Sequence, residues 1–173
     1  MKKFPMLAVL PLVAALAACA GSGGSAPSAE AKLNPTQGNA ASGTVSFRQE
    51  GNYVVMTARI ARLTPGAHGF HIHEKGDCSA PDATSAGGHF NPHGKAHGHP
   101  DHADHHAGDM PQLTADAAGN ATVTATLTGL SIGSGPAGIV GRGVIVHAAA
   151  DDYKTQPTGN SGARVACGVI VAK

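Results

Sequence analysis

Histidine stands out in this sequence, both in its number and in its spacing. All but one of the 11 histidines lie between residues 68 and 106. His71 and His73 are two residues apart in a segment with strand character, so both rings would lie on the same face of a strand, about 7 Å apart along the backbone. Two imidazoles placed in this way can bind one metal ion. A His-x-His pair taken alone is equally compatible with a purely structural role.

A third imidazole for the same ion is available in His147, which follows the apolar run from Val144 to Val146. A site made only of imidazoles favours copper or zinc over magnesium or calcium, which prefer oxygen ligands. His89 lies between this group and a second one in the sequence and could serve either. The second group has a spacing suited to a tetrahedral zinc site with nitrogen and oxygen ligands, and consists of His97, His106 and Asp109.

Alternation of apolar and polar residues predicts the strands that would position these rings. The segment 53–60 alternates in this way, and the segment 123–127 repeats the pattern after a hairpin-type turn at 118–120. Further strands are predicted at 44–48, 144–147 and 165–171. No segment combines an apolar stripe at helical spacing with helix caps. We therefore predict an all-β sandwich or flattened barrel.

Three segments carry no strand pattern, namely 74–110, 129–138 and 151–163. The first is rich in Gly, Pro, Asp and His and contains most of the candidate ligands. A loop of more than about 30 residues is uncommon in a compact domain and is usually functional. A bound metal ion can order such a loop by replacing the hydrophobic contacts that it lacks. We therefore expect metal ligation to hold this segment in place.

Length and composition limit the class of protein. A chain of 173 residues and 17.1 kDa fits one domain. With 24 glycines, 11 prolines and only 3% aromatic residues, it suits short strands joined by turns rather than a helical bundle or coiled coil. The formal net charge is only +1 and no cluster of lysines and arginines occurs. Nucleic-acid binding is therefore not expected.

Residues 1–18 have the features of a secretory signal peptide that is removed before the protein works. Lys2 and Lys3 precede an apolar stretch that Pro11 interrupts and that is too short to span a bilayer. Residues 19–28 are rich in Gly and Ser and predict a flexible linker. The folded domain is then expected to comprise residues 29–173.

The end of the signal peptide predicts a lipid anchor. Residues 16–19 (LAAC) resemble a bacterial lipobox, in which Cys19 would be lipidated and become the new N-terminus. Ala20, rather than aspartate, after the cysteine resembles the sorting signal for the outer membrane. The alternative is ordinary cleavage, with Cys19 as an incidental thiol. Lipidation is favoured because a free exposed thiol would be a liability in an oxidising compartment.

Two cysteines remain once Cys19 is assigned to the lipid, and an even number in an exported protein predicts a disulfide. A bond between Cys78 and Cys167, which are 89 residues apart, would stabilise the fold by about 4–5 kcal/mol in the chain-entropy model. The alternative is two buried thiols that do not meet.

Several motifs together resemble the copper/zinc superoxide dismutase family. Residues 66–74 (GAHGFHIHE), followed by 76–78 (GDC), are similar to the copper-loop signature of that family. Further motifs match in order and spacing: 88–92 (GHFNP), 97–98 (HG), 106–109 (HAGD), 141–147 (GRGVIVH) and 162–170 (GARVACGVI). The match covers roughly residues 29–173. The lipobox and linker resemble the bacterial envelope branch of the family.

The resemblance implies an eight-stranded Greek-key β-barrel, an Ig-like sandwich architecture, with long metal-binding loops. It implies that His89 bridges two ions, copper held by His71, His73, His89 and His147, and zinc held by His89, His97, His106 and Asp109. Asp151 matches a carboxylate that hydrogen-bonds one ligand of each metal, and Arg164 matches an arginine that attracts and positions the anion. Cys78 and Cys167 match a disulfide that ties the loop to the last strand.

The implied activity is the dismutation of superoxide to dioxygen and hydrogen peroxide, by alternate reduction and reoxidation of copper. The resemblance implies that His89 delivers a proton and that Arg164 guides the superoxide anion. It describes an oxidoreductase for antioxidant defence of the bacterial envelope, with copper and zinc as cofactors. The protein would lie in the periplasm and touch the outer membrane only through the lipid on Cys19. A homodimer is one assembly that the resemblance allows.

The sequence departs from the family pattern in two places. Only 12 residues separate Asp151 from Arg164, a shorter electrostatic loop than in the eukaryotic enzymes, so we expect steering charge from Lys75, Lys95, Lys154 or elsewhere in the chain. The second departure is a set of additional histidines that suit either a solvated polar loop or metal capture, and these are His93, His99, His102 and His105.

The histidine-rich loop also raises an alternative function, that of a non-catalytic envelope protein that buffers copper or zinc. A buffer has no need of the bridging His89, of Asp151 or of Arg164. All three occur at matching positions, which favours the dismutase. His68 also matches a family position, as a hydrogen-bonded packing residue.

Overall fold

The computed structural model describes residue 1, residues 25–133 and residues 135–173. The predicted signal peptide, Cys19 and most of the predicted linker lie outside the described residues. Within them the chain forms nine strands and one short 3-10 turn, η1 (Thr84–Ala86). No helix in this part of the chain is long and apolar enough to cross a membrane.

Seven strands form one antiparallel sheet in the order β5-β8-β9-β1-β2-β3-β7, and β4 pairs with β6 in a separate ribbon. The bounds are β1 (Ser28–Pro35), β2 (Ser42–Glu50), β3 (Tyr53–Ala61), β4 (Gly66–His68), β5 (Phe70–His73), β6 (Leu113–Ala115), β7 (Ala121–Thr128), β8 (Gly143–His147) and β9 (Arg164–Ala172). Only Gly69 separates β4 from β5, so the expected eight strands correspond to nine assigned ones.

The alternating segments form the predicted strands. Val54, Met56 and Ala58 of β3 are buried, while the residues between them are half-buried. On β7 the pairing places Leu127 opposite Val54. β5 and β8 are buried along their whole length, as expected of strands that have no solvated face. The all-β prediction is confirmed.

β1 begins at Ser28, the last residue of the segment predicted as a linker. Ser28 pairs with Arg48 of β2, and its carbonyl accepts a hydrogen bond from the amide of Lys173. β1 therefore joins β2 to the C-terminal strand β9. Its own residues Ala29, Ala31 and Leu33 are buried in the core.

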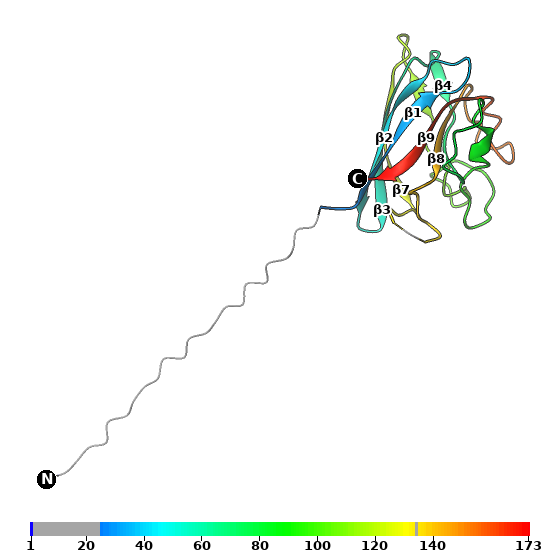
Figure 1. Cartoon of the computed structure of the whole chain (residues 1–173). Coiled ribbons are helices and arrows are strands. Elements are labelled where there is room, and N and C mark those ends of the chain that lie inside the picture. Colours follow the sequence, from blue (N-terminus) through cyan, green and yellow to red (C-terminus); the bar gives the residue numbers. More distant parts are fainter. Residues whose placement is uncertain (2–24, 134) are drawn as a thin grey trace.

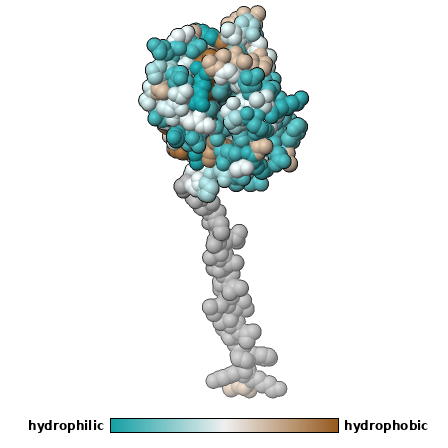
Figure 2. All heavy atoms as spheres, turned by 90° about the vertical axis from the view of Figure 1, so that its right-hand side faces the viewer, coloured by the Kyte–Doolittle hydropathy of each residue, from teal (hydrophilic) through white to brown (hydrophobic). Residues whose placement is uncertain are grey.

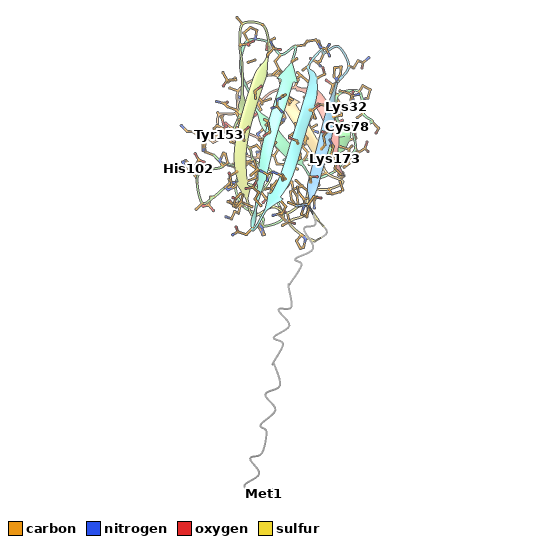
Figure 3. All side chains as sticks on the ribbon, turned by 90° about the vertical axis from the view of Figure 1, so that its left-hand side faces the viewer. Met1, Lys32, Cys78, His102, Tyr153 and Lys173 are labelled. Atoms are coloured by element: carbon orange, nitrogen blue, oxygen red, sulfur yellow. A yellow bond between two sulfur atoms is a disulfide. The ribbon has the colours of Figure 1, made fainter. Side chains whose placement is uncertain are left out.

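The sheet curls so that the long loops project together from one side of the molecule (Figure 1, right). On the opposite side β1, β2, β3 and β7 lie next to one another without loops in front of them (Figure 3). The loop side has a mostly hydrophilic surface (Figure 2). The fold thus separates a strand-covered face from a polar face built of loops.

A disulfide between Cys78 and Cys167 ties the first long loop to β9, with the two Cα atoms 5.8 Å apart. It packs against Ala83, Ala86 and Ile145 in a small cluster beneath the loop. The predicted disulfide is confirmed.

Candidate metal centre

The first donor group is built on strands. His71 and His73 lie two residues apart on β5, which pairs with β8 so that His73 is opposite Gly143. His147 ends β8, where an irregularity in the β8–β9 pairing falls between Val146 and His147. Such irregularities change the direction of a side chain. The three rings therefore come from two adjacent, fully buried strands.

His89 enters this group from the loop, because the loop pairs with the free edge of β5. The amide of Phe90 donates to the carbonyl of Ile72 at 2.8 Å, and the amide of Ile72 donates to the carbonyl of Gly108 at 2.8 Å. Isolated bridges place His89 opposite His73 and Asp109 opposite His71. A Cβ at Gly108 would overlap the carbonyl oxygen of Ile72, so this close approach requires glycine.

Four ring nitrogens of this first group are buried and have no hydrogen-bond partner: Nδ1 of His71 and Nε2 of His73, His89 and His147. These four nitrogens belong to the ligand set that the resemblance implies for copper. One ligand atom from each of the four residues lies within 4.8 Å of the others. Donors about 2.0–2.1 Å from one ion lie at most about 4.2 Å apart, so a small inward movement suffices.

The outer nitrogens of the same rings are held by acceptors, which fixes how the rings are oriented. His73 Nδ1 donates to the carbonyl of Gly87 at 2.9 Å, and His147 Nδ1 donates to the carbonyl of Gly162 at 3.1 Å. His71 Nε2 lies 2.6 Å from Asp151 Oδ2. Each outer N–H leaves a lone pair on the inner nitrogen, as metal ligation requires.

Burial keeps this group neutral. Desolvation lowers the pKa of His71 and lowers that of His73 well below its ordinary value. It also lowers the pKa of His89 to about 4 and that of His147 to about 3. Neutral imidazole is the form that binds metal. Four neutral, converging nitrogens fit a copper ion.

The second donor group is built on the loop around Asp109. Asp109 Oδ1 lies 2.8, 3.0 and 3.4 Å from Nδ1 of His89, His97 and His106, respectively. Nδ1 of His106 is 3.4 Å from Nδ1 of His89. The corners of a tetrahedron around zinc are about 3.3 Å apart for bonds of about 2.0–2.1 Å. The group therefore already has the size of a tetrahedral zinc site.

This second group is charged in the absence of metal. Burial alone would raise the pKa of Asp109, but hydrogen bonds from the three histidines lower it far below its usual range. Burial likewise opposes a charge on His97, but its contacts with Asp109 and Asp151 outweigh burial and raise its pKa to about 9. A cation at this position would take the place of the proton on His97.

Asp151 connects the two groups. Its Oδ2 accepts from His71 and its Oδ1 lies 2.9 Å from Nε2 of His97. Burial would raise its pKa, but these two histidines and the amide of Tyr153 lower it below its ordinary value. A Cβ at Gly159 would overlap Asp151 Oδ1, so the loop can pack here only with glycine. One carboxylate thus orients a ring of each group.

Comparison with known proteins agrees with this geometry. Residues 41–170 match the family model "Copper/zinc superoxide dismutase (SODC)". The chain is 44% identical over 147 residues to "Superoxide dismutase [Cu-Zn] 2" of Brassica juncea, covering 81% of this chain and 94% of that protein.

The chain belongs to the copper/zinc superoxide dismutase family.

A second relative is "Extracellular superoxide dismutase [Cu-Zn]" of Caenorhabditis elegans, 40% identical over 134 residues. The match covers 74% of this chain but only 60% of the worm protein. Among solved structures the chain resembles "clock protein EA4", with a TM-score of 0.76 and 40% identity over 87% of this chain and 98% of that one. Membership of the family confirms the predicted fold, the oxidoreductase class and the cofactors copper and zinc.

Arg164 lies beside the first donor group, which is called the copper group from here on and consists of His71, His73, His89 and His147. The second donor group, around Asp109, is called the zinc group. Its guanidinium donates to the carbonyl of Ala83 at 2.6 Å and to that of Gly87 at 2.7 Å. The carbonyl of Gly87 also accepts from His73, so one oxygen joins the arginine to a copper-group ring. The side chain is half-buried and lines a hollow together with Thr36 and Asp82. Its positive charge therefore lies next to a ring of the copper group.

Two loop residues escaped the sequence analysis. Gln156 brackets His97, accepting from its amide at 2.8 Å and donating to its carbonyl at 2.9 Å. The hydroxyl of Tyr153 accepts from the amide of Gln112 at 2.9 Å, and its ring stacks near that of His97. Tyr153 is one of only two tyrosines in the sequence and lies two residues after Asp151. This proximity to Asp151 was the only feature of the sequence that pointed to this part of the loop.

The remaining candidates lie outside the two groups. His68 is buried and its Nδ1 donates to the carbonyl of His147 at 2.7 Å, in agreement with a packing role. The three lysines considered for steering are exposed, and Lys95 donates to the carbonyl of Ala103. The additional histidines lie at or near the surface: His93, His99, His102 and His105.

Proposed function

We propose that this chain dismutates superoxide to dioxygen and hydrogen peroxide. Copper would be held by His71, His73, His89 and His147, and zinc by His89, His97, His106 and Asp109. The observation that carries the proposal is the position of His89. Its Nε2 is unpartnered among the copper-group nitrogens, while its Nδ1 lies 2.8 Å from Asp109 Oδ1 in the zinc group. A metal buffer gains nothing from one ring shared in this way.

Bound copper would supply the one-electron chemistry by which one superoxide is oxidised to dioxygen and a second, with two protons, is reduced to hydrogen peroxide. His89 is placed to hold one of these protons at Nε2, because its Nδ1 side is fixed by the zinc group. The ring therefore keeps its position whether or not Nε2 carries a proton.

Arg164 would attract and orient the anion. Two of its donor atoms are committed to the carbonyls of Ala83 and Gly87, which fixes the plane of the guanidinium. A fixed guanidinium presents its remaining N–H groups and its charge in one direction. A cation near the copper group raises the local concentration of superoxide.

Rapid mixing of the metal-loaded chain with superoxide, together with metal analysis, tests this function. We expect the chain carrying one copper and one zinc to accelerate superoxide decay. His147→Ala should lose both copper and the acceleration, whereas His93→Gln, a change at an exposed histidine, should keep both. A fully loaded chain without any effect on superoxide decay would leave only the buffer function.

We also propose that the protein is exported and anchored by a lipid on Cys19, as a member of the bacterial envelope branch. The disulfide supports an oxidising compartment. The extracellular designation of the worm relative agrees with export. Cys19→Ala should release soluble protein or block processing of the signal peptide. Full-length protein that is soluble in the periplasm and lacks acyl mass at its N-terminus would contradict the anchor.

Finally, we propose a homodimer that covers an apolar groove near the ends of β1 and β9. The groove is lined by Pro27, Ile132, Val140 and Ala172. Val140 and Val171 are, with Met1, the large hydrophobic residues that are exposed in the described part of the chain. Sedimentation should give twice the mass of the chain, and Val140→Lys should convert the dimer to monomer. A monomeric wild-type protein would contradict this assembly.

A further inference from the structure

Tyr153 follows β8 in the chain, but its side chain reaches the loop that carries the zinc group. Its hydroxyl accepts a hydrogen bond from the amide of Gln112 at 2.9 Å. Its ring plane is tilted by only 12° from that of His97, with the centroids 6.4 Å apart. In the sequence these two contacts lie on either side of the zinc-group donors His106 and Asp109. One tyrosine therefore ties down the loop both before and after these donors.

The ring of Tyr153 packs against two histidines of this loop. Besides its contact with His97, it lies edge-on to His99, with the centroids 4.5 Å apart and the planes 65° apart. Aromatic rings at centroid distances of about 4.5–7 Å attract one another in both arrangements. The side chain is half-buried, and it lies at the same edge of the molecule as His102, another residue of the loop (Figure 3). A movement of His97 away from the zinc group would disturb this packing.

The backbone of Tyr153 has a conformation that a tyrosine rarely adopts. Its φ is +56°, in the left-handed region that glycine and asparagine enter far more readily. Its amide donates to Asp151 Oδ1 at 2.7 Å, and the same oxygen lies 2.9 Å from Nε2 of His97. Strained residues persist where surrounding contacts hold them, and they cluster at functional sites. A tyrosine at this position is therefore explained by what its side chain contacts.

We propose that Tyr153 is a positioning residue of the zinc group. Its amide orients the carboxylate of Asp151, its ring packs along His97, and its hydroxyl anchors both to the residue that precedes β6. Without this side chain, His97 and Asp151 would be held less firmly toward the other donors, and zinc would leave faster. This role rests on the proposed function, because it presupposes that the zinc group binds zinc.

The rate of zinc release from the chain loaded with copper and zinc tests this role. With a chromogenic chelator in excess, Tyr153→Phe, which loses only the hydroxyl, should release zinc a few-fold faster than the wild type. Tyr153→Asn loses the ring as well and should release zinc at least about tenfold faster, as expected when a group that orients a ligand is removed. Asparagine suits the left-handed backbone better than tyrosine, so relief of backbone strain cannot account for faster release. Both variants should keep their copper.

The matched control is Tyr53→Phe, at the only other tyrosine. The hydroxyl of Tyr53 donates to Glu50 at 3.1 Å, so this variant also loses one hydrogen bond of a tyrosine hydroxyl. It should release zinc at the wild-type rate. Equal acceleration by Tyr53→Phe and Tyr153→Phe would show a general destabilisation and would overturn the proposal.

Co²⁺ in the zinc group separates positioning from general stability, because its visible absorption depends on the geometry of the donors. Tyr153→Asn should change the positions or intensities of these bands. Tyr153→Phe, which keeps the ring, should restore the wild-type spectrum. A wild-type spectrum and a wild-type rate of zinc release in Tyr153→Asn would overturn the proposal.

His106→Ala distinguishes a failure of this role from a failure of the ligand set. It removes a zinc ligand, so it should release zinc faster than either Tyr153 variant. Release at the wild-type rate in His106→Ala would overturn the ligand set and the role of Tyr153 together. Fast release in His106→Ala, with wild-type rates in both Tyr153 variants, would overturn the role of Tyr153 alone.

Discussion

The two donor groups share His89 but are built in different ways. Three copper-group rings lie on β5 and β8, whose residues are buried along the whole of both strands. The zinc group lies on the loop that follows β5, and its geometry depends on the contacts of Asp109 with three histidines. One group is held by the sheet, whereas the other is held by its own donors and by Asp151.

The difference extends to charge. In the absence of metal, burial keeps the copper-group rings neutral, whereas the zinc group holds a protonated His97 against the carboxylate of Asp109. Copper therefore meets nitrogens that are already free, while zinc must displace a proton. The sheet thus prepares the copper group in advance, whereas the zinc group is completed by its ion.

The largest effect is expected from His89→Ala, because this ring is common to both groups. Activity should fall at least about 100-fold, and the chain should lose affinity for zinc as well as change its copper coordination. His106→Ala, which removes a donor from the zinc group alone, should release zinc and leave copper in place. Metal analysis and the EPR spectrum of Cu(II) measure both effects. Unchanged zinc binding in His89→Ala would show that the groups are independent.

Arg164 should affect only the copper side. Arg164→Ala should lower activity about tenfold while both metals stay bound, and Arg164→Glu should lower it further because the local potential changes sign. A loss of about tenfold is of the order that electrostatic steering gives in general, and superoxide dismutases are a standard example of such steering. Added salt should slow the wild type, since exposed charges are screened beyond about 8–10 Å, and should slow Arg164→Ala less. Wild-type activity in Arg164→Glu with full copper would move the steering charge to the lysines.

Acid should separate the two metals. The pKa of His97 is raised to about 9, so below that pH zinc must displace a proton and its affinity falls as the pH falls. Between pH 5.5 and 8, zinc affinity should drop about tenfold per pH unit for one displaced proton. His147, with its pKa lowered to about 3, stays neutral over this range, so copper affinity should change less. Calorimetric titrations in several buffers measure the protons released. Loss of copper before zinc would contradict the comparison.

The smallest effect is expected from Gln156→Ala. Gln156 fixes only the backbone of His97, so its removal should weaken zinc binding by a few-fold and leave copper unchanged. Gln156→Glu can still accept from the amide of His97 but cannot donate to its carbonyl. Its zinc affinity should therefore lie between that of the wild type and that of Gln156→Ala. Equal losses of zinc and copper would assign Gln156 to the copper side as well.

The copper-side geometry was largely predictable from local pattern. Period-two alternation places His71 and His73 on one face, and an apolar strand ends at His147. The spacing of residues in the loop predicted His97, His106 and Asp109 as one zinc site. The role of His89 as a ligand of both metals came only from the resemblance. Gln156 could not be foreseen, because it reaches His97 across 59 positions of the chain through backbone contacts that leave no pattern. β1 was missed because small alanines form much of its buried face.

The bridging position of His89 is tested most directly by placing Cu²⁺ in both groups and recording the EPR spectrum at low temperature. If one imidazole ring joins the two ions through Nδ1 and Nε2, the unpaired electrons couple through the ring. We then predict that most of the Cu(II) signal disappears on loading the second site. Two independent Cu(II) signals of full intensity would contradict a shared His89.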